Sequence, residues 1–372
     1  MPCDSVRIIE PIDGAILNKH DGKWHSGRLE VVVRGITPER SKVTVNDVDA
    51  RVARGGCGFY DEFTCSVDLK DQENSIVARA ESGGKTTTDS ITVLWDKNSI
   101  KRYRFSTDDN ILFLKDLALN ASKRTSIFDN EYIAFWRQMH GNYGVKVQFN
   151  IYYQTEGFNL SQMPDKYKSE WQENADWMRL TFHALQNDPP NPYIRATYQE
   201  MQHDYSIVTR EIERFAGRSL LSPYTTVHWG EATLEACKAL RDCGIKGLVG
   251  YFLIDPSIGK PVVSYYLNSE STKYLNGHDC WKDTKEGIFF IKHDLVINLI
   301  DPSDIAPTLE SIASDPHRSE LMEVMIHEQY FNPQYPYYEP DAKERVIATL
   351  DWLKRNGYRP VFYEEGFLGS LE

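Results

Sequence analysis

From about Lys101 onward, strand-like and helix-like patterns alternate along the chain, and this alternation strongly limits the possible folds. Apolar stretches of strand length are followed by segments with apolar residues every three to four positions, which is typical of amphipathic helices. The strand candidates are 102–108, 146–153, 178–184, 221–229, 245–252, 287–299, 321–331 and 358–365, and the helix candidates include 196–217, 231–244 and 339–357. Repeated βα units predict a parallel sheet, and seven or eight units predict a barrel.

The first 98 residues follow a different pattern, in which short alternating runs are separated by Gly, Asp and Asn turns. Such runs lie at 28–35, 42–52, 60–69, 75–82 and 87–96. Their spacing of roughly ten residues predicts a small antiparallel sandwich of immunoglobulin type. We therefore expect a multidomain chain, with an all-β immunoglobulin-like sandwich over residues 1–98 and an α/β barrel of about seven strands over residues 99–372.

Charge and hydropathy exclude several classes of partner. The net charge of −12 argues against binding of nucleic acid and against electrostatic docking to an anionic membrane. No window approaches the roughly 18 to 20 apolar residues of a membrane span. The start, MPCDSVRIIEP, lacks the regions of a secretion signal, which predicts a cytoplasmic protein if this end is native and an exported one if a signal peptide was removed. The sequence predicts no oligomeric state.

Polar residues collect at the ends of the predicted barrel strands. They are Asp108 and Asp109, His183, His228, His293 and Asp294, His327 and Glu328, and Glu364 and Glu365. In βα barrels the active-site groups lie on the loops that follow the carboxyl ends of the strands. Because a charged pair that ends an apolar strand is costly unless it is used, His327 and Glu328 are both candidate catalytic residues.

Aspartate and histidine that converge on one point are typical ligands of zinc and related divalent ions. Such a metal makes its bound water more acidic, and a neighbouring carboxylate can take the proton. Two adjacent aspartates can divide this work, one as ligand and the other as base. A histidine across the pocket would then protonate the leaving group. We therefore predict a divalent metal cofactor, with zinc as the first choice.

Several motifs resemble those of the polysaccharide deacetylases of the NodB-homology type. The segment 105-FSTDD-109 resembles their first motif, which implies that Asp108 is the catalytic base and Asp109 a metal ligand. The segment 180-LTFHALQN-187 resembles their His-x-x-x-His motif and implies that His183 is a second ligand. The segment 325-MIHEQY-330 matches their Leu-x-His motif, with His327 as general acid. The resemblance also implies a distorted (β/α) barrel and a carbohydrate substrate.

The chain departs from the family pattern at two places. Asn187 stands where the family has a second histidine, so either Asn187 or His228 would complete the metal site. His228 and Trp229, followed by a glycine, occupy the place of an Arg-Pro-Pro-x-Gly turn without its arginine. The segment 278-HDCWKD-283 is a weak match to the family's tryptophan motif and implies that Trp281 lines the acetyl pocket.

Aromatic residues near these strand ends are suited to stacking on sugar rings. We count Trp229, Tyr193, Tyr330 and Trp281 as candidate substrate-binding residues. The prediction is a metal-dependent deacetylase that hydrolyses N- or O-acetyl groups on a poly- or oligosaccharide. One alternative is a glycoside hydrolase that pairs Asp109 with Glu328 or Glu365. Another is a carbohydrate-binding protein that has kept the barrel and lost the chemistry.

Overall fold

The computed structural model describes residues 4–55, 59–366 and 368, and the chain divides into two compact units. The first contains the residues up to Ser99 together with Cys280–Gly287, and the second contains Ile100–Asp279 and Ile288–Gly366. The segment Cys280–Gly287 therefore groups with the first unit, although the sequence places it within the second. Among the described residues, no helix is both long and apolar enough to cross a bilayer.

The first unit consists of N-terminal, largely antiparallel β-sheets. One sheet has the order β1-β4-β8-β7 with β3 beside β4, and the other has the order β2-β10-β9-β5-β6. Every second residue of β4 and β8 is buried, because successive side chains of a strand point to opposite faces and one face packs inward. The strands are β1 (Arg7–Glu10), β2 (Ile16–Leu17), β3 (Lys23–His25), β4 (Arg28–Thr37), β5 (Lys42–Val45), β6 (Val48–Asp49), β7 (Arg51–Arg54), β8 (Asp61–Leu69), β9 (Glu73–Ser82) and β10 (Lys85–Trp95). The immunoglobulin-type topology stays a prediction.

The second unit is a parallel α/β domain with a distorted barrel-like fold. One parallel sheet has the order β15-β12-β11-β23-β22, with β24 also beside β11, and a second has β16, β17 and β21 side by side. The strands are β11 (Arg102–Asn110), β12 (Val147–Tyr152), β15 (Met178–Ala184), β16 (Tyr224–Thr225), β17 (Gly247–Gly250), β21 (Ile288–Lys292), β22 (Leu295–Val296), β23 (Leu321–His327) and β24 (Arg359–Pro360). Two short antiparallel pairs lie outside these parallel sheets. They are β13 (Gln154–Thr155) with β14 (Phe158–Asn159), and β18 (Leu253–Asp255) with β19 (Lys260–Val262).

Two links join the parallel sheets into a ring. A parallel bridge connects Leu180 of β15 to Leu221, just before β16. On the other side, His293 N–H donates to the carbonyl of Gly250, whereas Asp294 N–H donates to the carbonyl of Glu323 on β23. The chain thus changes its pairing partner between His293 and Asp294, which divides the predicted strand 287–299 into β21 and β22.

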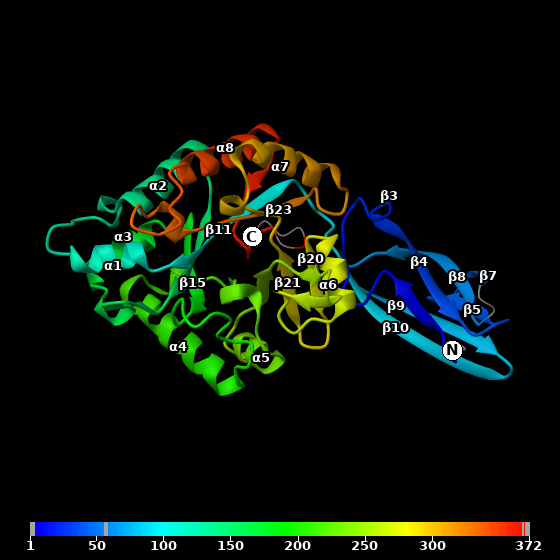
Figure 1. Ribbon diagram of the computed structural model, residues 1–372. Coiled ribbons are helices and arrows are strands. Elements are labelled where there is room, and N and C mark those ends of the chain that lie inside the picture. The colour runs from blue at the N-terminus through cyan, green and yellow to red at the C-terminus, as the bar shows by residue number, and fades with distance from the viewer. Residues whose placement is uncertain (1–3, 56–58, 367, 369–372) are drawn as a thin grey trace. The chain divides into compact units, whose positions relative to one another are not determined.

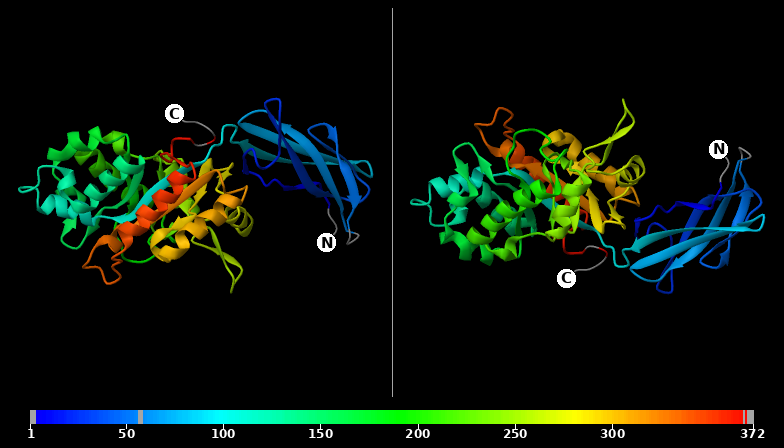
Figure 2. Two further views of the ribbon diagram at one scale, coloured as in Figure 1. Left: turned by 90° about the horizontal axis from the view of Figure 1, so that it is seen from above. Right: turned by 90° about the horizontal axis from the view of Figure 1, so that it is seen from below.

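Helices surround the strands of the second unit on the outside (Figures 1 and 2). They are α1 (Leu112–Leu119), α2 (Glu131–Tyr143), α3 (Lys168–Glu173), α4 (Tyr198–Phe215), α5 (Leu234–Asp242), α6 (Ser269–Asn276), α7 (Ile305–Ser314) and α8 (Ala342–Arg355). Helix α4 begins with a capping box, in which Thr197 Oγ1 accepts the N–H of Glu200 and the Glu200 carboxylate accepts the N–H of Thr197. It ends before Gly217, whose φ of +102° is open to glycine but not to most residues.

Candidate functional site

Strand β11 carries two carboxylates into the interior of the second unit. All nine of its residues are buried, because β12 and β23 flank it on both sides. A regular strand would point Asp108 and Asp109 to opposite faces. Here the pairing with β12 is irregular between Thr107 and Asn110, and Asp109 has a φ of +62°. This bulge and turn of the backbone place both carboxylates on the wall of one pocket.

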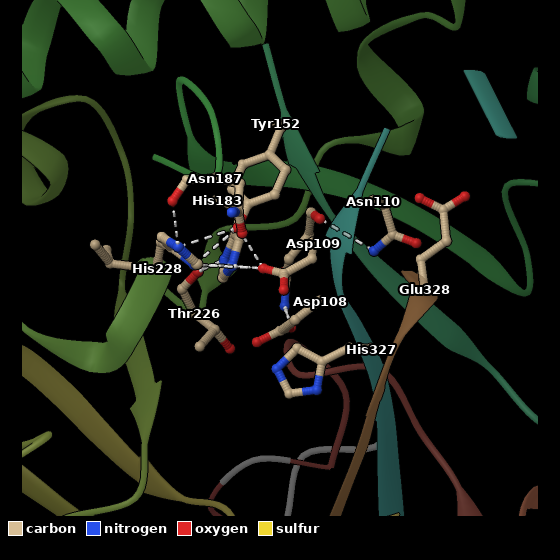
Figure 3. Close-up of polar contacts among 12 residues, drawn as sticks. Asp108, Asp109, Asn110, Tyr152, His183, Asn187, Thr226, His228, His327 and Glu328 are labelled. Atoms are coloured by element: carbon tan, nitrogen blue, oxygen red, sulfur yellow. Dashed lines mark hydrogen bonds and ion pairs between the residues drawn. The ribbon is translucent and has the colours of Figure 1, made fainter. Parts of the chain in front are cut away.

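Two histidines from different segments face the carboxylate of Asp109 (Figure 3). His183 at the end of β15 brings its Nε2 to 3.1 Å from Asp109 Oδ1. His228, in the 3-10 turn η5 (His228–Gly230), brings its Nδ1 to 3.3 Å from the same oxygen. The two ring nitrogens lie 3.2 Å from each other. One carboxylate oxygen and two imidazole nitrogens therefore converge, all within 4.8 Å of one another and all on buried residues.

Backbone carbonyls orient both imidazole rings. His183 Nδ1 donates to the carbonyl of Thr226, and His228 Nε2 lies 3.1 Å from the carbonyl oxygen of Asn187. A carbonyl only accepts, so each of these nitrogens carries a proton. The nitrogen that faces Asp109 donates to the carboxylate when the ring is charged and offers a lone pair to a metal when the ring is neutral. This is the arrangement of histidines that bind a metal with one nitrogen and are held in place through the other.

Tyr152 and Gln329 complete the surroundings of Asp109. The Tyr152 hydroxyl donates to Asp109 Oδ1 and lies 2.9 Å from His228 Nδ1, and Gln329 Nε2 donates to Asp109 Oδ2 at 2.7 Å. Burial acts to raise the pKa of Asp109, but the hydrogen bonds from His183 and His228 outweigh it, and the pKa lies well below its ordinary value. Asp109 is therefore ionised. Burial and the charge of Asp109 raise the pKa of Tyr152, which keeps its proton and acts as a donor.

Asp108 and His327 form a second pair on the same wall. They are register partners on β11 and β23, and their side chains lie side by side in Figure 3. The side-chain amide of Asn150 donates to Asp108 Oδ1. His327 Nδ1 lies 2.9 Å from Asn298 Oδ1, which accepts its proton. This bond leaves the other ring nitrogen, His327 Nε2, to take part in proton transfer.

The pocket that these residues line has a volume of about 570 Å³. Trp229 and Tyr330 are among its lining residues, and Trp229 is 50% exposed, so an aromatic face is open to a ligand. The pocket thus combines an ionised carboxylate, two oriented histidines and an aromatic wall. The Asp109, His183 and His228 group could hold a metal ion, because its donor atoms are of the kinds that borderline divalent metals accept.

Four other predicted site residues have different surroundings. Both oxygens of Glu328 accept backbone N–H groups, from Ile111, Leu112 and Phe113 at distances of 2.7–2.9 Å, so Glu328 caps the start of α1. Asn187 lines the pocket, but its side-chain amide donates to Asp188. The hydroxyl of Tyr193 donates to Asp204, away from this pocket. Trp281 belongs to the first unit and donates its indole N–H to the carbonyl of Asp13.

The structure also brings in residues that the sequence does not single out, among them Tyr152, Gln329, Asn298, Asn150 and Thr226. Tyr152 ends strand β12, and a strand-end position is the one signal that could have drawn attention to it. Thr226 acts through its carbonyl group, which every residue has, so no sequence pattern could identify it. His293, placed by the sequence inside a strand beside Asp294, also lines the pocket.

No family model and no curated protein matches the sequence. Among solved structures, an endo-β-1,4-mannanase from Thermotoga petrophila aligns over 26% of this chain at 22% identity with a TM-score of 0.19, and this chain covers 20% of its length. A candidate α-galactosidase from Bacteroides fragilis aligns over 94% of this chain and 78% of its own at 11% identity and a TM-score of 0.27. A candidate β-galactosidase from the same species aligns over 87% of this chain and 46% of its own, at 11% identity and a TM-score of 0.24. The likeness to these enzymes is distant and carries no argument about activity.

Proposed function

We propose that this chain is a metal-dependent hydrolase that removes N- or O-acetyl groups from a carbohydrate, with zinc held by Asp109, His183 and His228. The observation that carries the proposal is the buried three-donor group, whose ligand atoms lie within 4.8 Å of one another. The ring nitrogens that face away from it are bonded to the carbonyls of Thr226 and Asn187. Hydrogen bonds from the second nitrogen of a ligand histidine to a carbonyl are typical of metal sites, where they orient the ring.

The neighbouring residues suit hydrolysis of an acyl group. When bound, the ion would supply Lewis-acid activation of the attacking water and of the acetyl carbonyl. Asp108 accepts the proton of the water, and the amide of Asn150 holds its carboxylate in place. His327, when both of its ring nitrogens carry protons, gives the Nε2 proton to the leaving nitrogen or oxygen, while Asn298 accepts from Nδ1 and keeps the ring oriented. The chain thus offers a base and an acid on the same pocket wall as the three ligand residues.

The carbohydrate part of the proposal rests on the resemblance of the motifs to polysaccharide deacetylases and on the wall of the pocket. Trp229 and Tyr330 line it together with Tyr251 and Tyr335, and aromatic faces stack on the apolar faces of sugars. Trp281 and Tyr193 are left out of the proposed sugar contacts, because neither lines this pocket.

Glycoside hydrolysis is the second candidate, because the pocket also presents two carboxylates, Asp108 and Asp109, beside an aromatic wall. The other carboxylates considered for such a pair are already engaged. Glu328 accepts three backbone N–H groups, and both oxygens of Glu365 lie 2.6–2.7 Å from Lys146 Nζ. A glycosidase mechanism would therefore use Asp108 together with Asp109.

The test begins with the metal content of the purified full chain, measured by elemental analysis beside the variants Asp109→Ala and His183→Ala. The matched control is His203→Ala, which removes an exposed histidine from α4. We expect roughly one zinc ion per chain in the wild type and in the control, and loss of the ion from both ligand variants. Acetate release from acetylated glycans is then measured beside the release of new reducing ends.

Each outcome separates the candidates. Acetate without new reducing ends supports the deacetylase. Reducing ends without acetate would establish the glycosidase in its place, and glycan binding without either product would establish a binding protein. If no transition metal is retained even after supplementation, the metal-dependent proposal is wrong.

A further inference from the structure

His293 has a polar ring that is buried in the pocket wall and has no hydrogen-bond partner among the described residues. Only 2% of the residue is exposed, and His293 lines the same pocket as Asp108 and His327. Within the described part of the chain, neither Nδ1 nor Nε2 makes a hydrogen bond. Buried polar groups without partners are rare in folded proteins because they lose their bonds to water and gain nothing in return. An unpaired histidine that lines a pocket is therefore a place where a ligand can supply the missing bonds.

Hydrogen bonds and ring packing hold the backbone and the side chain of His293 in place. Its N–H donates to Gly250 at 2.8 Å, and the ring packs edge-on against Tyr251 with the centroids 5.7 Å apart. The next residue, Asp294, turns the other way and binds Arg318 at 2.6 Å and the N–H of Glu323 at 3.0 Å. Asp294 anchors the chain, and His293 is held as a preformed part of the pocket wall.

We propose that His293 is a substrate-binding residue whose ring forms hydrogen bonds with a hydroxyl or amide group of the bound carbohydrate. A neutral imidazole offers one N–H and one lone pair, and a sugar hydroxyl or an acetamide offers the matching acceptor and donor. Sites built to pair with such a group discriminate against analogues that lack it, because the protein group is then left unpaired. The inference rests on the proposed function, since it assigns a contact within the same pocket.

The test compares His293→Phe, which keeps a planar ring and removes both nitrogens, with His293→Gln, which keeps a donor and an acceptor. The control is His203→Phe on the exposed face of α4. Acetate release is measured on fully N-acetylated chitotetraose and on acetylated xylan, and thermal unfolding is measured without glycan. For His293→Phe we expect KM to rise by roughly tenfold with kcat changed much less, the effect of one lost hydrogen bond. We expect His293→Gln to recover part of the loss.

The unfolding experiment distinguishes a binding role from a structural one. Replacing an unpaired buried imidazole with phenylalanine removes its desolvation cost, so the melting temperature of His293→Phe should rise. A fall in the melting temperature of His293→Phe would show that the nitrogens are bonded within the fold and would overturn the inference. An unchanged KM in His293→Phe, where the wild type is active, would overturn it as well. If the wild type releases acetate from neither glycan, the proposed function fails, and the assignment of a carbohydrate contact fails with it.

Discussion

Asp109 is the residue on which the candidate site depends most directly. Its φ of +62° is a conformation that residues other than glycine seldom adopt and that costs on the order of 1 kcal/mol or more. Such strain persists where the surroundings determine the conformation, and here four side chains contact the carboxylate, those of Tyr152, His183, His228 and Gln329. The strained backbone is therefore best understood as the means by which one carboxylate reaches both histidines.

Tyr152 gives a first prediction at this scale. Its hydroxyl donates to Asp109 and lies 2.9 Å from His228 Nδ1, so it holds two of the proposed ligands. Removing the hydroxyl with Tyr152→Phe should weaken zinc binding by roughly 10- to 100-fold, as is usual for outer residues of metal sites. The measurement is the zinc Kd by competition with a chelator. Tyr198→Phe on α4, whose hydroxyl binds Asp242, is the control, and equal Kd values for the two variants would contradict the prediction.

His293 gives a prediction about pH. Burial lowers its pKa from the ordinary 6.5 to about 4, so between these values the unfolded chain binds a proton that the folded protein does not. Stability therefore rises with pH across this window and is lost as pH falls through it. Relative to His293→Phe, the wild type should lose about 2 kcal/mol of unfolding free energy between pH 7 and pH 5. Urea denaturation at both pH values measures this, and equal losses in the two proteins would refute it.

Part of the candidate site can be predicted from the sequence, because residue types at the ends of strands indicate it. Asp109, His183 and His228 could be grouped because the carboxyl ends of neighbouring parallel strands meet, and the structure brings the three together. Glu328 also ends a strand, yet its carboxylate turns to the backbone of α1. Nothing in a strand pattern predicts the direction of a side chain beyond the strand end. Trp281 could not be placed either, because its partner Asp13 is 268 positions away in the sequence.

At the scale of elements, Glu328 connects the end of β23 to the start of α1. The first N–H groups of a helix have no partner within the helix, and no side-chain cap comes from Ile111 at this helix start. Glu328, at the end of β23, supplies the carboxylate oxygens that accept these N–H groups of α1. The carboxyl end of β11 leads into α1 at the same point. Burial raises its pKa to about 7, although the three N–H groups favour its charged form.

The variant Glu328→Ala should therefore destabilise the second unit by about 3 kcal/mol, because it leaves buried N–H groups at the start of α1 unpaired. Glu328→Gln keeps one side-chain acceptor and should cost less. Chemical denaturation measures the change, with Glu310→Ala on the exposed face of α7 as the control. If Glu328→Ala retained full stability but lost only activity, the residue would be catalytic, as the sequence suggests, and the capping role would be secondary.

Elements with strong local signals agree with the structure more closely than those that depend on their partners. The predicted helix 196–217 contains α4, because a capping box and a glycine mark its two ends. The predicted strand 221–229 reduces to Tyr224–Thr225, since the chain then turns through η5, where Trp229 has a φ of +69°. The run 358–365 keeps only Arg359–Pro360 as strand. Apolar alternation alone does not reveal where the neighbouring strand ends.

For the whole molecule, the position of the site predicts how metal affects stability. Asp109, His183 and His228 all belong to the second unit, and the first unit has a separate core of its own. A ligand stabilises only the part of a protein whose unfolding releases it. Zinc should therefore act on the unfolding of the second unit and leave that of the first unchanged, which makes calorimetry of the full chain informative.

Zinc at about 100 times its Kd should stabilise the second unit by about 2.7 kcal/mol, which corresponds to a rise in Tm of roughly 5–10 °C for a unit of this size. A chelator should reverse the shift. In Asp109→Ala the shift should disappear, because the carboxylate ligand is gone, whereas His203→Ala should keep it. Differential scanning calorimetry on the full chain resolves which transition moves. A shift of equal size in Asp109→Ala would mean that zinc binds elsewhere, and a shift confined to the first unit would exclude the proposed metal site.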